Sequence, residues 1–291
     1  GRHRPWHPAR GAAPHLRAAA RCGRPRSHDR EDAVPRFPAD PRRGLHTVSV
    51  GTSLRLFTVS GIPVRVHWTF FLLLGWLFFR PLVGGAANAV IEGLLNTALV
   101  LAVFCCVVLH EFGHAFAARW FGIRTRDVTL LPIGGVARLE RMPIQPMQEL
   151  VIALAGPMVN VAIVTVLFPL ALLLPGGRLV LAGAGAGATI GEFVMTLAIV
   201  NIVLVVFNMI PAFPMDGGRV LRAILTLGMN RVTATRVAVR TGQVIAVLLA
   251  IVGLYSSPLL VLVAIFVFFG AAAEAYAVTL SERATVDDHD R

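Results

Sequence analysis

Long apolar segments constrain this chain more than any other feature of its sequence. A transmembrane helix needs about 20 predominantly apolar residues. Six apolar segments occur, and several of them approach or exceed that length: about Trp68–Val83, Leu94–Ala118, Leu150–Leu174, Phe193–Ile210, Val244–Tyr255 and Leu259–Val278. The last two are short and closely spaced, so they could instead form one hairpin.

Composition supports a membrane class and excludes several others. Only 15% of the residues are charged, and the mean hydropathy is +0.71. An ordinary soluble enzyme, a disordered chain or a small secreted scaffold would have a different balance. We therefore predict an all-α polytopic membrane protein with about six transmembrane helices.

Two stretches interrupt the helical pattern with β-like features. Leu54–Val66 alternates like a strand and is broken at Gly61–Pro63, while Thr129–Leu139 is apolar, contains Pro132 and is broken by Gly134 and Gly135. We predict a small membrane-associated β hairpin or strand element here. Its free edge could pair with an extended substrate, which makes Gly134 and Gly135 candidates for substrate handling. A structural loop is the alternative.

The net charge of +11 is concentrated at the start of the chain. Residues 1–50 contain 11 Arg and 4 acidic residues, whereas residues 51–291 contain 16 Arg and 12 acidic residues. We predict a disordered Arg/Pro-rich tail over 1–50, a transmembrane domain over 51–280 and a short polar tail over 281–291. The first tail could be absent from the natural protein, with translation starting near Val48 or Val50. This distribution does not favour a nucleic-acid partner.

Arginine positions predict the orientation of the segments. Fourteen Arg residues of the region after residue 50 fall on one side of the predicted bundle, and only Arg80 and Arg178 fall on the other. The positive-inside rule then places both termini and the two long loops in the cytoplasm. We expect a multi-pass protein of the plasma (inner) membrane.

Polar residues within the second apolar segment indicate a metal site. His110 and His114 are spaced i and i+4, so they share one face of a helix, and Glu111 lies between them. Two imidazoles at this spacing can bind Zn²⁺, with the glutamate placed to activate a water molecule. A hydrogen-bonded pair of core histidines is the alternative.

A tetrahedral zinc site needs a further protein ligand, and Asp216 is the candidate. It follows the fourth segment in the sequence Asn208-Met-Ile-Pro-Ala-Phe-Pro-Met-Asp216-Gly-Gly. Two crossings separate it from His114, so both residues lie on the same side of the membrane. Irregular backbone at membrane depth is tolerated only where it is buried in protein or lines a wet cavity. A helix-ending turn with a solvated aspartate is the alternative.

These motifs carry a family resemblance. HEFGH in a transmembrane segment and NMIPAFPMDGG after a later one resemble the site-2 proteases, which are intramembrane zinc metalloproteases. The segments GIPVRVHW, LLPIGGVARLE and AGPMVN are similar to family segments in the same order. The chain ends 13 residues after Val278, so it resembles the type without C-terminal cystathionine-β-synthase domains.

The resemblance implies a function and a set of site residues. It implies that His110, His114 and Asp216 bind one Zn²⁺ per chain and that Glu111 is the general base. The reaction is then hydrolysis of peptide bonds in membrane-spanning substrates during regulated intramembrane proteolysis. Single-pass signalling proteins such as anti-sigma factors are candidate substrates by family analogy.

Two asparagines are further candidates for the site. Asn208 and Asn160 are amides in apolar segments that could stabilise the oxyanion, with Asn208 preferred; a helix–helix hydrogen bond is the alternative for each.

Two other functions are alternatives to the protease. A metal or ion transporter would also use intramembrane His and Asp. A non-catalytic binder on a protease scaffold is the third class, and the intact Glu111 argues against it.

Overall fold

The computed structural model describes residues 53–85, 88–132, 134–141, 143, 145–178 and 189–289. The predicted tail over residues 1–50 and the last two residues of the chain lie outside this described part. The described residues all belong to the compact unit that begins at Val50.

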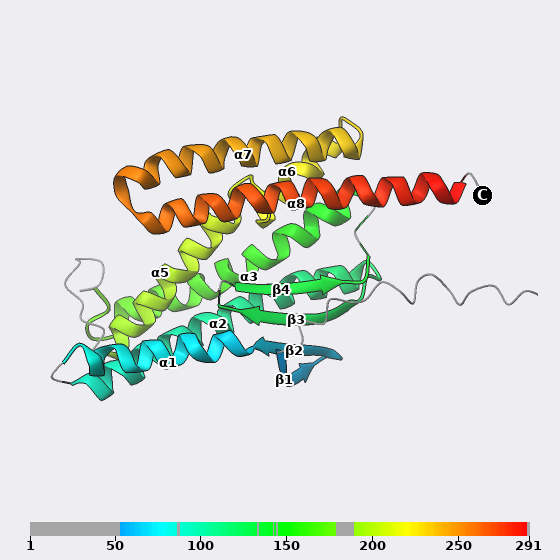
Figure 1. Ribbon diagram of the computed structural model, residues 1–291. Coiled ribbons are helices and arrows are strands. Elements are labelled where there is room, and N and C mark those ends of the chain that lie inside the picture. Colours follow the sequence, from blue (N-terminus) through cyan, green and yellow to red (C-terminus); the bar gives the residue numbers. More distant parts are fainter. Residues whose placement is uncertain are drawn as a thin grey trace, which may run out of the picture. The chain divides into compact units, whose positions relative to one another are not determined.

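Helices make up most of this unit (Figure 1). In chain order they are α1 (Trp68–Val83), α2 (Ala89–Trp120), α3 (Pro146–Leu173), α5 (Ile190–Asn208), α6 (Asp216–Thr226), α7 (Arg231–Ser256) and α8 (Pro258–His289). Four of them, α2, α3, α5 and α7, are long and apolar enough to cross a membrane. The apolar helix α1 and the apolar stretch Pro258–Glu274 of α8 are shorter. The chain is therefore a mostly helical membrane protein, as predicted.

Two helical features differ from the sequence-based expectation. Helix α7 begins at Arg231, whereas the apolar segment starts only at Val244. The side chain of Asn230 caps this helix by accepting a hydrogen bond from the Thr233 N–H at 2.8 Å. Helix α6 was not predicted. Hydropathy marks only the apolar part of a helix, so it missed both the polar start of α7 and the amphipathic α6.

The two β-like stretches form one sheet of four strands. These are β1 (Ser53–Val59), β2 (Ile62–His67), β3 (Thr125–Leu131) and β4 (Gly134–Leu139), in the order β1-β2-β3-β4. Both hairpins, β1–β2 and β3–β4, are antiparallel, and a parallel pairing of β2 with β3 joins them. The predicted strand element is confirmed, although the parallel pairing spans too much sequence for a local pattern to show it.

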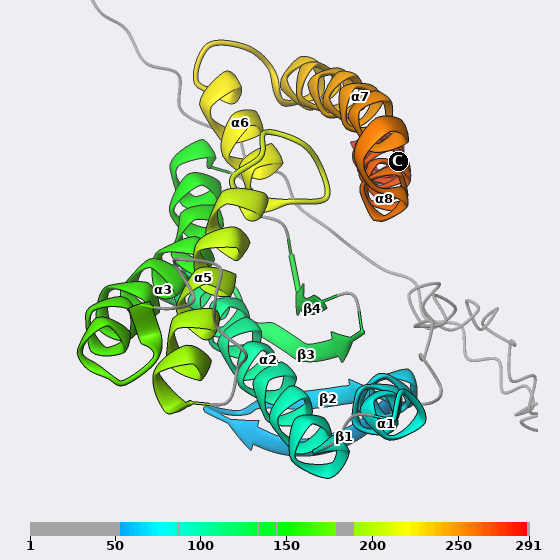
Figure 2. The same ribbon diagram turned by 90° about the vertical axis from the view of Figure 1, so that its left-hand side faces the viewer.

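The sheet packs against the helix that carries the HExxH motif. Val64, Val66 and Val128 of the sheet form a buried core with Phe112 and Ala115 of α2. Because these two α2 residues flank His114, the same packing places β3 and β4 beside the motif. Figure 2 shows α2 running alongside β2, β3 and β4.

The loop before α6 is held by the last two helices. Ala212 and Met215 are buried with Ala246 of α7 and Val267 of α8. Helices α7 and α8 lie side by side in both views. This packing fixes the irregular segment between Asn208 and Asp216, which two prolines prevent from continuing as a helix.

Candidate metal centre

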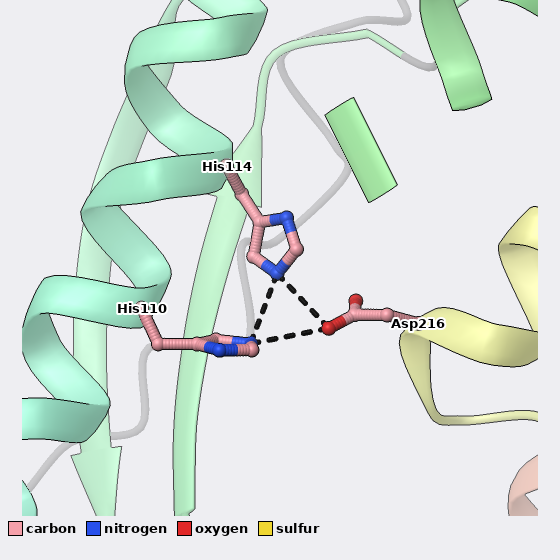
Figure 3. A group of neighbouring side chains, drawn as sticks. All are labelled: His110, His114 and Asp216. Carbon is pink, nitrogen blue, oxygen red and sulfur yellow. Dashed lines mark hydrogen bonds and ion pairs between the residues drawn. The ribbon is translucent and has the colours of Figure 1, made fainter. Parts of the chain in front are cut away.

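Two helices bring three ligand atoms together within the bundle. The Nε2 atoms of His110 and His114 are 3.1 Å apart, and each lies 3.1 Å from Oδ2 of Asp216 (Figure 3). All three residues are buried. The pair on α2 and the aspartate that begins α6 are separated by about 100 residues of sequence. The structure therefore assembles the three residues that the sequence singled out.

A backbone carbonyl orients one of the imidazoles. Nδ1 of His114 lies 2.7 Å from the carbonyl oxygen of Ile152 on α3. A carbonyl only accepts hydrogen bonds, so Nδ1 carries the proton and Nε2 of the neutral ring presents a lone pair. Metal-ligating histidines are commonly held in this way.

The donor set fits a zinc ion. In a tetrahedral site with bonds of about 2.0–2.1 Å, ligand atoms lie about 3.3–3.4 Å apart, close to the 3.1 Å edges seen here. Lone pairs of three acceptors at such distances repel unless a proton or a metal cation lies among them. Imidazole nitrogen and carboxylate oxygen are ligands that zinc accepts.

Glycine at position 156 of α3 leaves room for this cluster. A Cβ atom at Gly156 would lie 2.7 Å from Nε2 of His110 and still closer to the ring of His114. Any other residue would therefore press its Cβ atom against the Nε2 atoms of both histidines. The close approach of α3 to α2 at this point makes Gly156 part of the site.

The position of Asp216 favours its ionised form. Burial opposes ionisation, but in the metal-free protein hydrogen bonds from the His110 and His114 rings, and their positive charge when protonated, outweigh it and hold the pKa of the Asp216 carboxyl well below its usual range. Asp216 is also the first residue of α6. The partial positive charge at a helix N-terminus stabilises a carboxylate there.

Glu111 lies between the histidine pair and the sheet. The N–H of Ala137 on β4 donates a hydrogen bond to Oε2 of Glu111 at 3.2 Å. Gly135 lies against the same side chain, since a Cβ atom there would be 2.8 Å from Cγ of Glu111. The carboxylate is therefore held at the edge of β4 that faces away from β3.

The other candidate residues have different surroundings. Gly134 begins β4 with a φ of +142°, a conformation that glycine adopts readily. Nδ2 of Asn208 donates to the carbonyl of Leu204 in its own helix at 3.0 Å. Asn160 on α3 is fully buried, and within the described part of the chain neither of its amide atoms has a hydrogen-bond partner.

Sequence reasoning missed three contributors to this region. The hydrogen bond from His114 to the Ile152 carbonyl involves a backbone group, so no pattern of side chains in the sequence could predict it. Gly156 stood in the AGPMVN segment but received no role. Arg222 was counted as a loop charge, whereas its side chain is fully buried in α6. No local pattern signals this burial, because the carboxylates that pair with Arg222 come from other helices.

Comparison with known proteins identifies the family. A family model described as peptidase family M50 matches residues 98–185 and 177–252. The chain belongs to peptidase family M50, the site-2 protease family. A solved structure, the site-2 protease from Methanocaldococcus jannaschii, is 36% identical, with a TM-score of 0.55, and the match covers 77% of this chain and 95% of that one.

Two curated relatives agree with this family. A zinc metalloprotease of Methanocaldococcus jannaschii is 36% identical over 229 residues, which are 78% of this chain and 61% of the relative. Stage IV sporulation protein FB of Bacillus subtilis is 26% identical over 176 residues, which are 60% of this chain and 56% of the relative. The chain thus spans little more than half the length of these M50 relatives.

Gly156→Ala is expected to abolish binding of a divalent metal, because the new methyl group would displace the imidazoles of His110 and His114. The measurement is the metal content of the purified protein after loading with zinc and gel filtration in detergent. Gly75→Ala on α1 is the matched control, since nothing lies within 4 Å of a Cβ atom there. Equal metal content in both variants would contradict the geometry described.

Proposed function

We propose that this chain is an intramembrane zinc endopeptidase that hydrolyses peptide bonds of membrane-spanning proteins. The observation that carries the proposal is the triangle of His110, His114 and Asp216, with the Glu111 carboxylate next to it. These groups lie among apolar helices long enough to cross a membrane. Membership of the M50 family supports the protease over a transporter or a non-catalytic binder.

The chemistry divides between the metal and the chain. Zinc held by the three side chains would act as a Lewis acid on the scissile carbonyl and acidify the attacking water towards a pKa of about 7. Glu111 takes the proton from that water and passes it to the leaving amine. Its hydrogen bond from the Ala137 N–H keeps the carboxylate oriented while leaving its other oxygen available.

The edge of β4 is proposed to bind the substrate in an extended form. A peptide bond in a helix has its carbonyl engaged in the helical hydrogen bonds, so a transmembrane substrate must unwind before it is cut. The Ala137 N–H points to Glu111 and away from β3. Backbone groups of Gly135, two residues earlier, face the same edge, because bonded and non-bonded positions alternate along an antiparallel pair. A strand added here would pass directly beside Glu111.

Asn208 is proposed to stabilise the tetrahedral oxyanion. It ends α5 just before the loop that leads to Asp216. One amide hydrogen is donated to the Leu204 carbonyl, and an amide nitrogen carries a second. Asn160 is the second candidate, because it lies one helical turn beyond Gly156 with both amide atoms buried.

Six crossings of the plasma membrane are proposed, made by α1, α2, α3, α5, α7 and α8. The turns α1–α2 and α7–α8 lie at one end of the bundle in Figure 1, while the sheet and the end of α8 lie at the other. Arg80 is at the first end, and most other Arg residues are at the second. On the positive-inside rule, we propose that the sheet and the metal centre face the cytoplasm. Substrates of the anti-sigma-factor type are proposed by family analogy.

Glu111→Gln is expected to retain about one zinc per chain and to lose cleavage of a transmembrane peptide by at least about 100-fold, since general-base catalysis contributes about 10²–10⁴. Zinc content and cleavage are measured on the same detergent preparation. Asp216→Ala is the companion variant and should lose both. Cleavage by Glu111→Gln at the wild-type rate would contradict the proposal.

The orientation is tested by labelling intact cells with a membrane-impermeant thiol reagent. In a variant without the natural cysteines, Arg178→Cys is expected to react from outside. Arg141→Cys, beyond β4, is expected to react only after the membrane is permeabilised. The reverse pattern would overturn the proposed orientation.

A further inference from the structure

A fully buried arginine lies on the helix that begins with Asp216. Arg222 is on the second turn of α6, and its side chain has no exposed surface. A guanidinium cannot lose its charge in a protein, and burying an uncompensated charge is very costly. The partners of Arg222 are therefore an obligatory part of the fold.

Those partners come from two other helices. Nε of Arg222 donates to Oε1 of Glu149 on α3 at 2.8 Å, and Nη2 donates to the same oxygen. Nη1 donates to Oε1 of Glu274 on α8 at 2.6 Å. Its Cζ lies 4.9 Å from the ring centre of Phe213, in the loop before Asp216. One guanidinium thus joins α6, α3, α8 and the loop.

A second arginine completes the charge balance. Nη2 of Arg231, at the start of α7, lies 3.6 Å from Oε2 of Glu149. Its Nη1 donates to the carbonyl of Pro143 at 2.6 Å. The two arginines and two glutamates together carry no net charge, which is the condition for keeping such a cluster in a low-dielectric interior.

The cluster is linked to both parts of the metal centre. Glu149 lies one helical turn before Ile152, whose carbonyl holds the His114 ring. Arg222 lies on the same short helix as Asp216. Helix α3 therefore holds the histidine through Ile152 and the aspartate's helix through Glu149.

A purely stabilising role explains this arrangement poorly. Replacing a buried ion pair by apolar residues of similar volume is often neutral or stabilising. Interactions that orient metal ligands, by contrast, typically change metal affinity by about 10- to 100-fold when removed. The Arg222–Glu149 pair joins α6, which supplies Asp216, to α3, which orients His114. This position fits a role in orienting the metal ligands.

We propose that Arg222 is a positioning residue: through Glu149 it fixes the distance between Asp216 and the histidine pair, and so sets the affinity for the metal. The inference rests on the proposed zinc site. It assigns to Arg222 no contact with the substrate or the metal.

The test compares zinc affinity in the full-length protein in detergent, measured by competition with a chelator. Arg222→Lys keeps the charge but loses the planar fork that reaches both carboxylates. We expect it to weaken zinc binding by about 10- to 100-fold. Arg240→Lys on α7 is the matched control, because Arg240 is exposed, and it should bind zinc like the wild type.

A second variant and a second signal separate positioning from folding. Glu149→Gln/Arg222→Met removes one charge of each sign, so the cluster that keeps Glu274 and Arg231 stays neutral and the variant remains interpretable if Arg222→Lys does not fold. At saturating Co²⁺, both variants should show a visible absorption spectrum altered from that of the wild type, because the ligand geometry has changed. A loss of stability alone would leave that saturated spectrum unchanged.

The outcomes are distinguishable. If wild type binds zinc and the variants bind it within about twofold of wild type, with the same Co²⁺ spectrum, the positioning role is wrong and the zinc site stands. If wild type itself binds no zinc, the proposed function fails and the positioning role fails with it. The inference is supported if both Arg222 variants bind zinc more weakly and have an altered Co²⁺ spectrum, while Arg240→Lys behaves like the wild type.

Discussion

The rest of this structure depends on three atoms that lie 3.1 Å from one another. They are the Nε2 atoms of His110 and His114 and Oδ2 of Asp216. Two imidazole nitrogens and a carboxylate oxygen so close together, away from water, form a favourable site for a cation. To bring them together, the chain must pack α3 against α2 with no side chain at Gly156. It must also bring the carboxylate of Asp216, which lies about 100 residues later in the sequence at the start of α6, back to the two histidines.

The surrounding elements serve this arrangement from two sides. On one side, the sheet packs on α2 and brings an edge of β4 to Glu111. On the other side, α7 and α8 enclose the loop before Asp216, and the buried Arg222 ties α6 to α3. Under the proposed function, a substrate strand on β4 would meet Glu111 and a metal centre that are already oriented, and such orientation lowers the barrier to reaction.

Sequence patterns predicted what is local. The apolar segment Trp68–Val83 coincides with α1, because hydropathy alone defines a lipid-facing helix. Asp216 was placed near His114 by counting crossings, and their proximity is confirmed. Arg222 was counted only among the arginines that mark the cytoplasmic side, and its burial depends on Glu149 and Glu274, which come from distant helices. The parallel pairing of β2 with β3 and the role of Gly156 likewise depend on contacts between distant segments. The roles of Glu111, Asn208 and Asn160 stay predictions.

Anomalous X-ray diffraction at the zinc absorption edge, from crystals of the zinc-loaded protein, tests the central claim most directly. The account predicts one strong anomalous peak, with Nε2 of His110, Nε2 of His114 and a carboxylate oxygen of Asp216 each at about 2.0–2.2 Å from it. A peak elsewhere in the molecule, or zinc bound by the histidines with Asp216 remote from it, would contradict the account.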